Sequence, residues 1–235
     1  MSVHDFNYDG QTPSNYQQKC PVVILLDKSG SMQGPAIDEL NKGLQLFKSE
    51  IMKNSTAAAR IDLAVVSFND QTSIEHDFGL INDEYHMPEL QASGSTAMVD
   101  AMRTAIKLID GRKTYYKSSG QTYFRANLIL ITDGYPDDGQ DTEGLAAELK
   151  KEVSDKRFNF WPIAVESADM NILEKWAQPH MKGNLPVMKL NGLKFGELFM
   201  WLSASMSKIS TSRPGEGIDI TPTKKHNPFA NFQVD

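Results

Sequence analysis

Short apolar runs alternate with stretches of helical periodicity along most of the chain. Two continuous apolar runs, at 21–26 and 127–132, are rich in Val, Ile and Leu, which is typical of strands buried on both faces. Shorter runs predict further strands at 61–68, 73–78, 158–165 and 186–190. We expect the strand at 73–78 to lie at an edge of the sheet.

Between the strands, apolar residues recur every three or four positions, which predicts amphipathic helices. The predicted helices cover residues 35–51, 98–109, 145–153, 170–176 and 194–209. Gly111 is expected to end the second helix, so that the basic and aromatic segment 112–125 becomes a solvated loop. This composition is also compatible with stacking on nucleic-acid bases, which is the weaker interpretation in an acidic chain.

The alternation of strands and helices predicts an α/β fold. We expect a doubly wound, mostly parallel sheet with helices on both faces and one antiparallel edge strand. We divide the chain into a polar N-terminal extension (1–19), the folded domain (20–210) and a loosely packed C-terminal tail (211–235). Sheets of this kind bind ligands beyond the carboxyl ends of their strands, so we expect a functional site among the residues that follow the apolar strands.

Composition excludes several classes of protein. The 235 residues suffice for a sizeable core, and 30 acidic against 24 basic residues give a net charge of −6, which argues against a nucleic-acid partner. The single cysteine, Cys20, excludes an internal disulfide framework and a cysteine-rich zinc site. The sequence contains neither an apolar run of membrane-spanning length nor a recognisable secretory signal, so we expect a cytoplasmic protein without membrane contact.

Oxygen-bearing side chains follow the apolar strands at three places. Asp27, Ser29 and Ser31 alternate after the first strand, Thr96 precedes the second helix, and Asp133 follows the strand at 127–132. Carboxylate and hydroxyl oxygens are the ligands that hard cations prefer, so we predict a site for Mg²⁺ (or Ca²⁺ or Mn²⁺) at which one coordination position remains for an outside acid. The alternative is that Ser29 and Ser31 only cap the following helix.

Other charged residues near these motifs are expected to have structural roles. Asp137 and Asp138 are expected to cap the next helix or to face solvent, although they could also raise the affinity for a cation. Asp70 is expected to be a turn residue, although it could also contact one of the metal ligands. The side chain of Lys28 should point away from the ligands on either side of it. The five histidines have no metal-ligand spacing, and we predict no zinc site from them.

The motifs D-x-S-x-S, S-G-S-T and T-D-G together resemble those of a von Willebrand factor A (VWA) domain, which has a Rossmann-like fold. In that family they form the metal-ion-dependent adhesion site (MIDAS), and the resemblance assigns its ligands to Asp27, Ser29, Ser31, Thr96 and Asp133. A narrower resemblance links the chain to the stand-alone VWA proteins of bacterial tellurite-resistance gene clusters. It rests on the segments LLDKSGSMQGPAIDELNKGLQ, ASGSTAM, TDGYPDD and FGELFMWLSASMSKISTSRPGE.

The resemblance implies a non-enzymatic protein-interaction module. A partner protein would supply an Asp or Glu to the metal, and the narrower resemblance implies a protein kinase and a PP2C-type phosphatase as partners in a stress or phage-defence system. We expect a monomer, although the sequence does not determine the oligomeric state.

Two other functions remain open on the sequence. One is a Mg²⁺-dependent phosphohydrolase-like enzyme, but Ser29 stands where the D-x-D motif of one such class has its proton-donating Asp. The P-loop and nucleophile-elbow motifs of other enzymes are absent from the sequence. The other is a signalling adaptor regulated by phosphorylation of the hydroxyl-rich tail.

Overall fold

The computed structural model describes residues 8, 12–166, 168–177, 185–213, 216, 218–223 and 227–231. Its strands are β1 (Cys20–Asp27), β2 (Ile61–Phe68), β3 (Thr72–Leu80), β4 (Ala126–Thr132), β5 (Phe158–Ala164) and β6 (Met188–Lys189). Its helices are the 3₁₀ helix η1 (Gly30–Met32), α1 (Pro35–Met52), α2 (Ser55–Arg60), α3 (Met98–Ser118), α4 (Thr142–Ser154), α5 (Met170–Ala177) and α6 (Phe195–Thr211).

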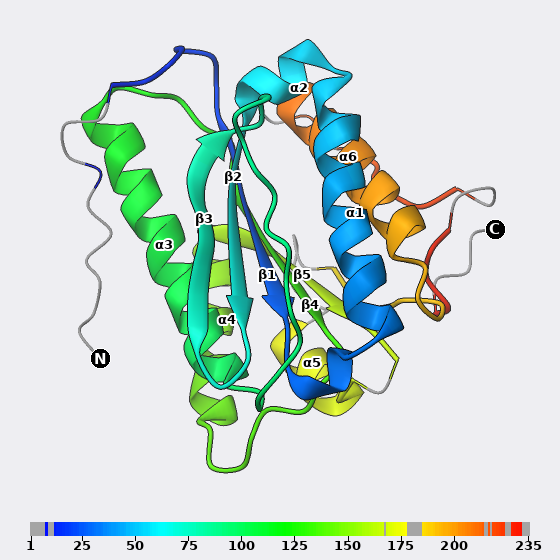
Figure 1. Cartoon of the computed structure of the whole chain (residues 1–235). Coiled ribbons are helices and arrows are strands. Elements are labelled where there is room, and N and C mark those ends of the chain that lie inside the picture. The colour runs from blue at the N-terminus through cyan, green and yellow to red at the C-terminus, as the bar shows by residue number, and fades with distance from the viewer. Residues whose placement is uncertain are drawn as a thin grey trace.

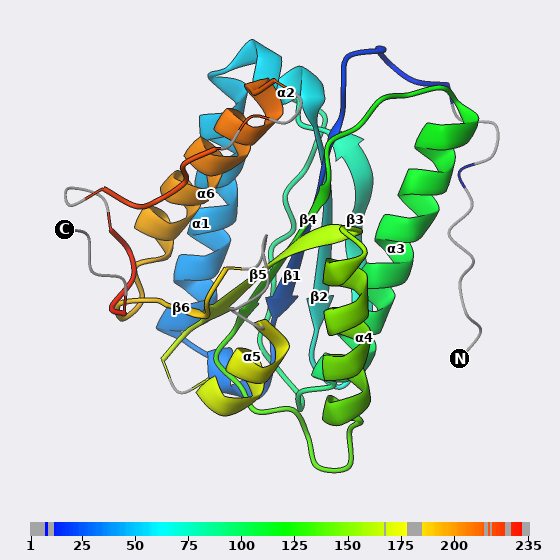
Figure 2. The same ribbon diagram turned by 180° about the vertical axis from the view of Figure 1, so that it is seen from behind.

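The six strands form one sheet in the order β3-β2-β1-β4-β5-β6. Every neighbouring pair is parallel except β2 and β3, which are antiparallel, so β3 is the antiparallel edge strand. Helices α1 and α6 cover one face, and α3 and α4 cover the other (Figures 1 and 2). The predicted doubly wound α/β fold is therefore confirmed.

The central strand β1 is buried on both faces, as its continuous apolar sequence predicts. Val22, Ile24 and Leu26 join the core beneath α1 and α6. Val23 and Leu25 point the other way, into the core beneath α3 and α4. Because β1, β2 and β4 are parallel, their carboxyl ends meet at one edge, the lower end of the sheet in Figure 1. The loops that follow β1 and β4 consequently lie side by side there.

Helix α3 is longer than the sequence predicts. Gly111 does not end it, and the helix continues to Ser118, so the first half of the segment 112–125 is helical instead of a loop. The reason is tertiary: Arg112 and Tyr116 both donate hydrogen bonds to Oδ2 of Asp62, which is fully buried on β2. The Arg112 guanidinium also lies over the rings of Tyr8 and Tyr115.

The C-terminal part of the domain also differs from prediction. The strand expected at 186–190 is reduced to Met188–Lys189, and the next residue, Leu190, forms an isolated antiparallel bridge with Phe229. Phe229 is buried and packs edge-on against Trp201, with ring centroids 5.0 Å apart. The loose packing expected throughout the tail is thus wrong for residues 227–231. Among the described residues, no helix combines the length and apolar character needed to cross a bilayer.

The buried ion pair of Arg112 and Asp62 is predicted to contribute to the stability of the domain. Replacing Arg112→Met leaves the Asp62 carboxylate buried without its cation, so we expect the free energy of unfolding to fall by about 3–5 kcal/mol in urea denaturation. The double variant Asp62→Leu/Arg112→Met removes both charges and should recover most of this loss. Equal losses of unfolding free energy in the single and double variants would contradict a stabilising interaction between Arg112 and Asp62.

The close packing of α1 against α6 leaves no room for a side chain at Gly43. A methyl group on Gly43 of α1 would lie 2.3 Å from Cδ2 of Phe199, which is fully buried on α6. Although alanine favours helix by about 0.5–1 kcal/mol, we expect Gly43→Ala to lower the free energy of unfolding by about 1–3 kcal/mol through overpacking. Gly196→Ala is the control, because its nearest neighbour would be 4.0 Å away and the change should be nearly neutral.

Candidate metal site

The Asp27 carboxylate lies at the end of β1 and is completely buried. Its Oδ1 accepts a hydrogen bond from the backbone N–H of Ser29 at 2.8 Å. Its Oδ2 accepts one from the hydroxyl of Thr132 at 2.5 Å, and Thr132 Oγ1 in turn accepts the N–H of Gly134 at 3.1 Å. These contacts fix the start of the loop after β1 and tie it to the end of β4.

A short chain of hydrogen bonds joins the same two loops on the outer side. The hydroxyls of Ser29 and Ser31 are 3.0 Å apart, and Ser31 donates to Oδ1 of Asp133 at 2.8 Å. Ser29 and Asp133 are buried, whereas Ser31 is exposed. The oxygens predicted from the alternation of Asp27, Ser29 and Ser31 therefore do gather with Asp133, and the cluster reaches the surface at Ser31.

Thr96 completes the set from a separate loop. A methyl group on Gly134 would lie 3.1 Å from Oδ2 of Asp27 and 3.4 Å from Oγ1 of Thr96, so both oxygens flank the same small residue. The loop before α3 is held against the loop after β1 by two backbone bonds, Gly30 N–H to Gly94 O at 3.0 Å and Ser93 N–H to Lys28 O at 2.9 Å. All five sequence-predicted side chains are thus brought together at one edge of the sheet.

Comparison with known proteins identifies the family of this domain. The family model described as the von Willebrand factor type A domain matches residues 22–190, which is more than half of the chain. The chain belongs to this family. The matched segment runs from β1 to the end of β6 and so includes every element that carries the five side chains.

Solved structures share the VWA fold at low sequence identity. The VWA2 paralogue of ArnB from Sulfolobus acidocaldarius is 16% identical with a TM-score of 0.54, and the match covers 81% of this chain and 46% of that one. Proximal thread matrix protein 1 from the mussel byssus, with zinc in its MIDAS motif, is 16% identical with a TM-score of 0.55, covering 81% and 48%. The pilus adhesin SpaC from Lactobacillus rhamnosus GG is 15% identical with a TM-score of 0.58, covering 83% and 32%.

A search of curated proteins found an uncharacterized protein of Methanocaldococcus jannaschii. It is 28% identical over 123 residues, which are 51% of this chain and 25% of that protein. The chain therefore spans about a quarter of this relative and less than half of the three solved structures named above. At these identities, the structural likeness shows the fold alone.

Asp137 has a role in this VWA domain that the sequence did not reveal. We expected it to cap the next helix or to face solvent, but its two carboxylate oxygens both accept the backbone N–H of Thr96, each at 3.0 Å. The helix cap is instead Asp141, which accepts the N–H of Gly144. Gln140 supports the same loop, because its amide donates to Thr96 O at 2.6 Å and accepts the N–H of Val99 at 2.8 Å.

Three other charged residues near the site have structural contacts. Lys28 points away from the cluster, as predicted, and pairs with Glu75 on β3 at 3.1 Å. Asp70 lies against the loop before α3, where a side chain on Gly94 would meet its Oδ1 at 2.5 Å. Asp169 accepts the N–H groups of Asn171 and Ile172 at the start of α5.

The electrostatics of the cluster favour an added positive charge. Burial raises the pKa of the Asp27 carboxyl to about 6, and the nearby charge of Asp133 acts in the same direction. Burial also raises the pKa of Asp133, with a further contribution from the charge of Glu166. Two carboxylates and three hydroxyls form an all-oxygen donor set, which fits a hard divalent cation better than a soft one.

Metal sites built only from acidic, histidine or cysteine side chains are a separate possibility. In the part of the chain that the structure describes, no three such residues lie close enough together to hold an ion. The cluster at the carboxyl edge of the sheet instead combines hydroxyls with the carboxylates of Asp27 and Asp133.

The contact between Asp137 and Thr96 can be tested directly. Replacing Asp137→Ala releases the N–H of Thr96, so the hydroxyl of Thr96 loses its fixed position and we expect the affinity for Mg²⁺ to fall about tenfold. Isothermal titration calorimetry with MgCl₂ measures this. Asp138→Ala is the control, since it removes the same charge from the neighbouring exposed position. Equal losses in both variants would show that only net charge matters.

Proposed function

We propose that this chain is a non-enzymatic, divalent-cation-dependent protein-interaction module. One observation carries the proposal: hydroxyl and carboxylate oxygens from three loops converge where Ser31 and Asp133 hydrogen bond at 2.8 Å and Asp27 and Thr96 flank Gly134. Asp27, Ser29, Ser31, Thr96 and Asp133 are the residues that would hold the cation. Membership of the VWA family supports this assignment.

The preferred cation in this proposal is Mg²⁺, with Ca²⁺ or Mn²⁺ as alternatives. Oxygen-only donor sets favour these hard ions over zinc or copper. In the mussel protein the MIDAS motif is occupied by zinc, which is not one of the hard cations proposed for this chain. A metal-binding experiment on this chain therefore has to compare Mg²⁺ with Zn²⁺ as well as with Ca²⁺ and Mn²⁺.

The occupant of the remaining coordination position is proposed to be an Asp or Glu of a partner protein. The site opens to the surface at Ser31, where an outside carboxylate has access. Tyr135, two residues after Asp133, exposes 60% of its surface, which is unusual for a large aromatic side chain. Exposed aromatic residues beside a charged site are typical of protein interfaces, and Tyr135 would pack against the partner next to its acid.

The surroundings of Asp27 disfavour the phosphohydrolase alternative. A nucleophilic carboxylate needs an accessible oxygen, whereas Asp27 is fully buried and both of its oxygens already accept hydrogen bonds. Ser29 contributes a hydroxyl engaged with Ser31 instead of a proton-donating acid. Both contacts support a binding role for this edge of the sheet.

The cellular setting of the proposal comes from the resemblance to the VWA proteins of tellurite-resistance clusters. We propose a monomeric, cytoplasmic protein whose domain at 20–210 acts with a protein kinase and a PP2C-type phosphatase in a stress or phage-defence system. In an alternative form of this proposal, such a kinase phosphorylates the hydroxyl-rich tail, and the protein acts as a signalling adaptor.

Metal and partner binding are tested in two steps. First, Mg²⁺ titration by calorimetry should show a single site whose affinity falls about tenfold or more in Ser29→Ala and Thr96→Ala, because each variant removes one oxygen ligand. Ser49→Ala on the exposed surface of α1 is the matched control and should leave the affinity unchanged. Second, purified candidate partners are captured in Mg²⁺ and in EDTA, and capture should require the metal.

Tyr135→Ala separates the partner from the metal in the same assay. We expect this variant to bind Mg²⁺ normally but to capture less partner. Capture that is equally strong in EDTA would contradict the metal-bridged contact. Turnover of a generic phosphoester that Asp27→Ala abolishes would instead establish the enzymatic alternative.

A further inference from the structure

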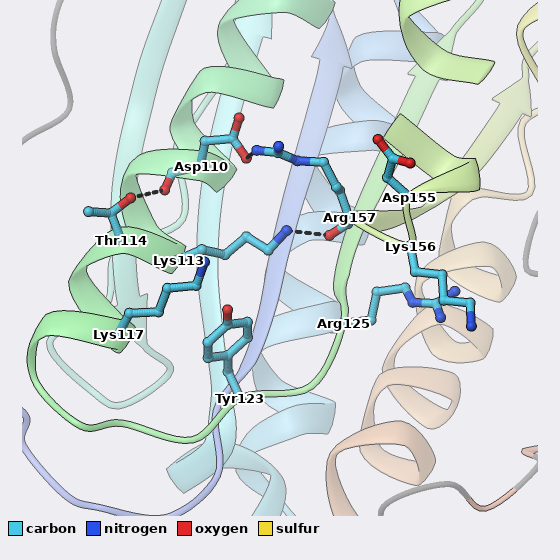
Figure 3. A pocket seen from close by; sticks show the side chains of 9 residues that line it. All are labelled: Asp110, Lys113, Thr114, Lys117, Tyr123, Arg125, Asp155, Lys156 and Arg157. Atoms are coloured by element: carbon cyan, nitrogen blue, oxygen red, sulfur yellow. Dashed lines mark hydrogen bonds and ion pairs between the residues drawn. The ribbon is translucent and has the colours of Figure 1, made fainter. Parts of the chain in front are cut away.

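A polar pocket lies at the opposite end of the sheet from the metal site. Its volume is about 440 Å³, which is within the usual range for small-molecule sites. Three segments that are distant in sequence form it: the C-terminal half of α3, the loop that enters β4, and the turn between α4 and β5 (Figure 3). We call it the basic pocket, and its lining residues are Asp110, Lys113, Thr114, Lys117, Tyr123, Arg125, Asp155, Lys156 and Arg157.

The charge of the basic pocket is opposite to that of the whole chain. Five cationic side chains and two carboxylates line it, a local excess of three positive charges in a chain of net charge −6. Arg157 is already engaged by Asp110 and Glu152. Within the described part of the chain, Lys113, Lys117, Arg125 and Lys156 have no carboxylate within ion-pair distance. Two of the four donate to uncharged oxygens, Lys113 to the backbone of Arg157 at 2.6 Å and Arg125 to Oδ1 of Asn159 at 3.3 Å, so these contacts leave their positive charges without a neutralising carboxylate.

Lys113 places a half-buried ammonium group in the wall of the pocket. Its ammonium is directed across the pocket and donates to the backbone oxygen of Arg157 at 2.6 Å (Figure 3). Burial lowers the pKa of Lys113. The nearby charges act in both directions, because the carboxylates of Asp110 and Glu152 raise this pKa whereas Arg157 and Lys117 lower it. An anion in the pocket would act in the same direction as these carboxylates and stabilise the ammonium group.

The backbone at Lys156 points to a role for its side chain. Helix α4 ends in a pair of bonds, Lys156 N–H to Val153 O and Arg157 N–H to Glu152 O, both at 2.9 Å, which is the Schellman pattern. Lys156 occupies the left-handed position of this motif with φ of 56°, where glycine is the favoured residue. A lysine in this unfavourable conformation lines the pocket across from Lys117 on α3 (Figure 3).

We propose that the basic pocket binds a compact polyphosphate-bearing small molecule. Several ammonium and guanidinium groups around one cavity are suited to an anion with two or more phosphate groups, because each phosphate accepts charge-assisted hydrogen bonds from more than one donor. Lys117, Arg125 and Lys156 would contact the phosphates, with Lys113 behind them and Tyr123 at the side. This ligand site is separate from the metal site and does not depend on its function.

The observations favour a compact ligand over a nucleic-acid strand. A strand would extend beyond the pocket onto a surface that is acidic on balance, and repulsion there would oppose binding. The ring of Tyr123 is stacked on Tyr116, with centroids 5.0 Å apart, so one of its faces is already covered. The basic and aromatic composition of the segment 112–125 is thus explained better by one cavity than by a track of stacked bases.

Calorimetric titration with inorganic tripolyphosphate tests the proposal on the full chain. The buffer contains EDTA, so that a cation at the other end of the sheet cannot attract the phosphates. We expect saturable binding with one site per chain. The affinity should fall about tenfold in Lys156→Gly and in Lys117→Gln, since each variant removes a charged hydrogen-bond donor.

Two features of these variants keep the result unambiguous. Lys156→Gly supplies the residue that the left-handed turn favours, so its melting temperature should stay equal or rise while binding weakens. Lys53→Gln, at the exposed end of α1, removes the same charge as Lys117→Gln outside the pocket and should not change the affinity. Absence of saturable binding, or equal weakening by Lys53→Gln, would overturn the proposal. Tighter binding of an oligothymidylate than of tripolyphosphate, with the same dependence on Lys117 and Lys156, would assign the pocket to nucleic acid instead.

Discussion

The buried carboxylate of Asp27 is the group on which the arrangement of the metal-site edge depends. A charge without contact to water is unfavourable unless hydrogen bonds compensate for its lost hydration. Here the compensating donors are the N–H of Ser29 and the hydroxyl of Thr132, which belong to two different strand ends. The same contacts that solvate Asp27 thus set the turn after β1 and fix that turn against β4. Ser29, Ser31 and Asp133 take their positions from this junction, and Gly134 leaves room for Thr96 to approach it.

Most of the fold could be predicted because local pattern and tertiary environment agree. β1 and β4 are apolar along their length since both faces of the sheet are covered, and the helices carry their apolar residues at the expected spacing. The prediction was wrong where a distant partner decides the local structure. Gly111 would end an isolated helix, but the bonds of Arg112 and Tyr116 to Asp62 hold the next two turns in helical form. The pairing of Leu190 with Phe229 similarly requires a segment almost forty residues away, which no local pattern contains.

In the candidate site, too, local sequence predicts some features, whereas contacts between distant segments decide others. Its five oxygen-bearing residues follow apolar strands or precede a helix at recognisable spacing, and parallel strands necessarily bring such positions to one edge. The support for Thr96 could not be predicted, because Asp137 and Gln140 reach back to it only through the path of the loop after β4. The basic pocket was equally hidden. The sequence contains its lysines and arginines in three separate segments, and only the continuation of α3 past Gly111 brings them to one cavity.

Helix α3 connects the two ends of the molecule. It begins two residues after Thr96 and carries Lys113 and Lys117 in its last two turns. With a rise of about 1.5 Å per residue, its 21 residues span about 30 Å. The metal site and the basic pocket thus lie at opposite ends of one helix. Any effect of one ligand on the affinity for the other has to be reciprocal: whatever the cation does to anion binding, the anion does equally to cation binding.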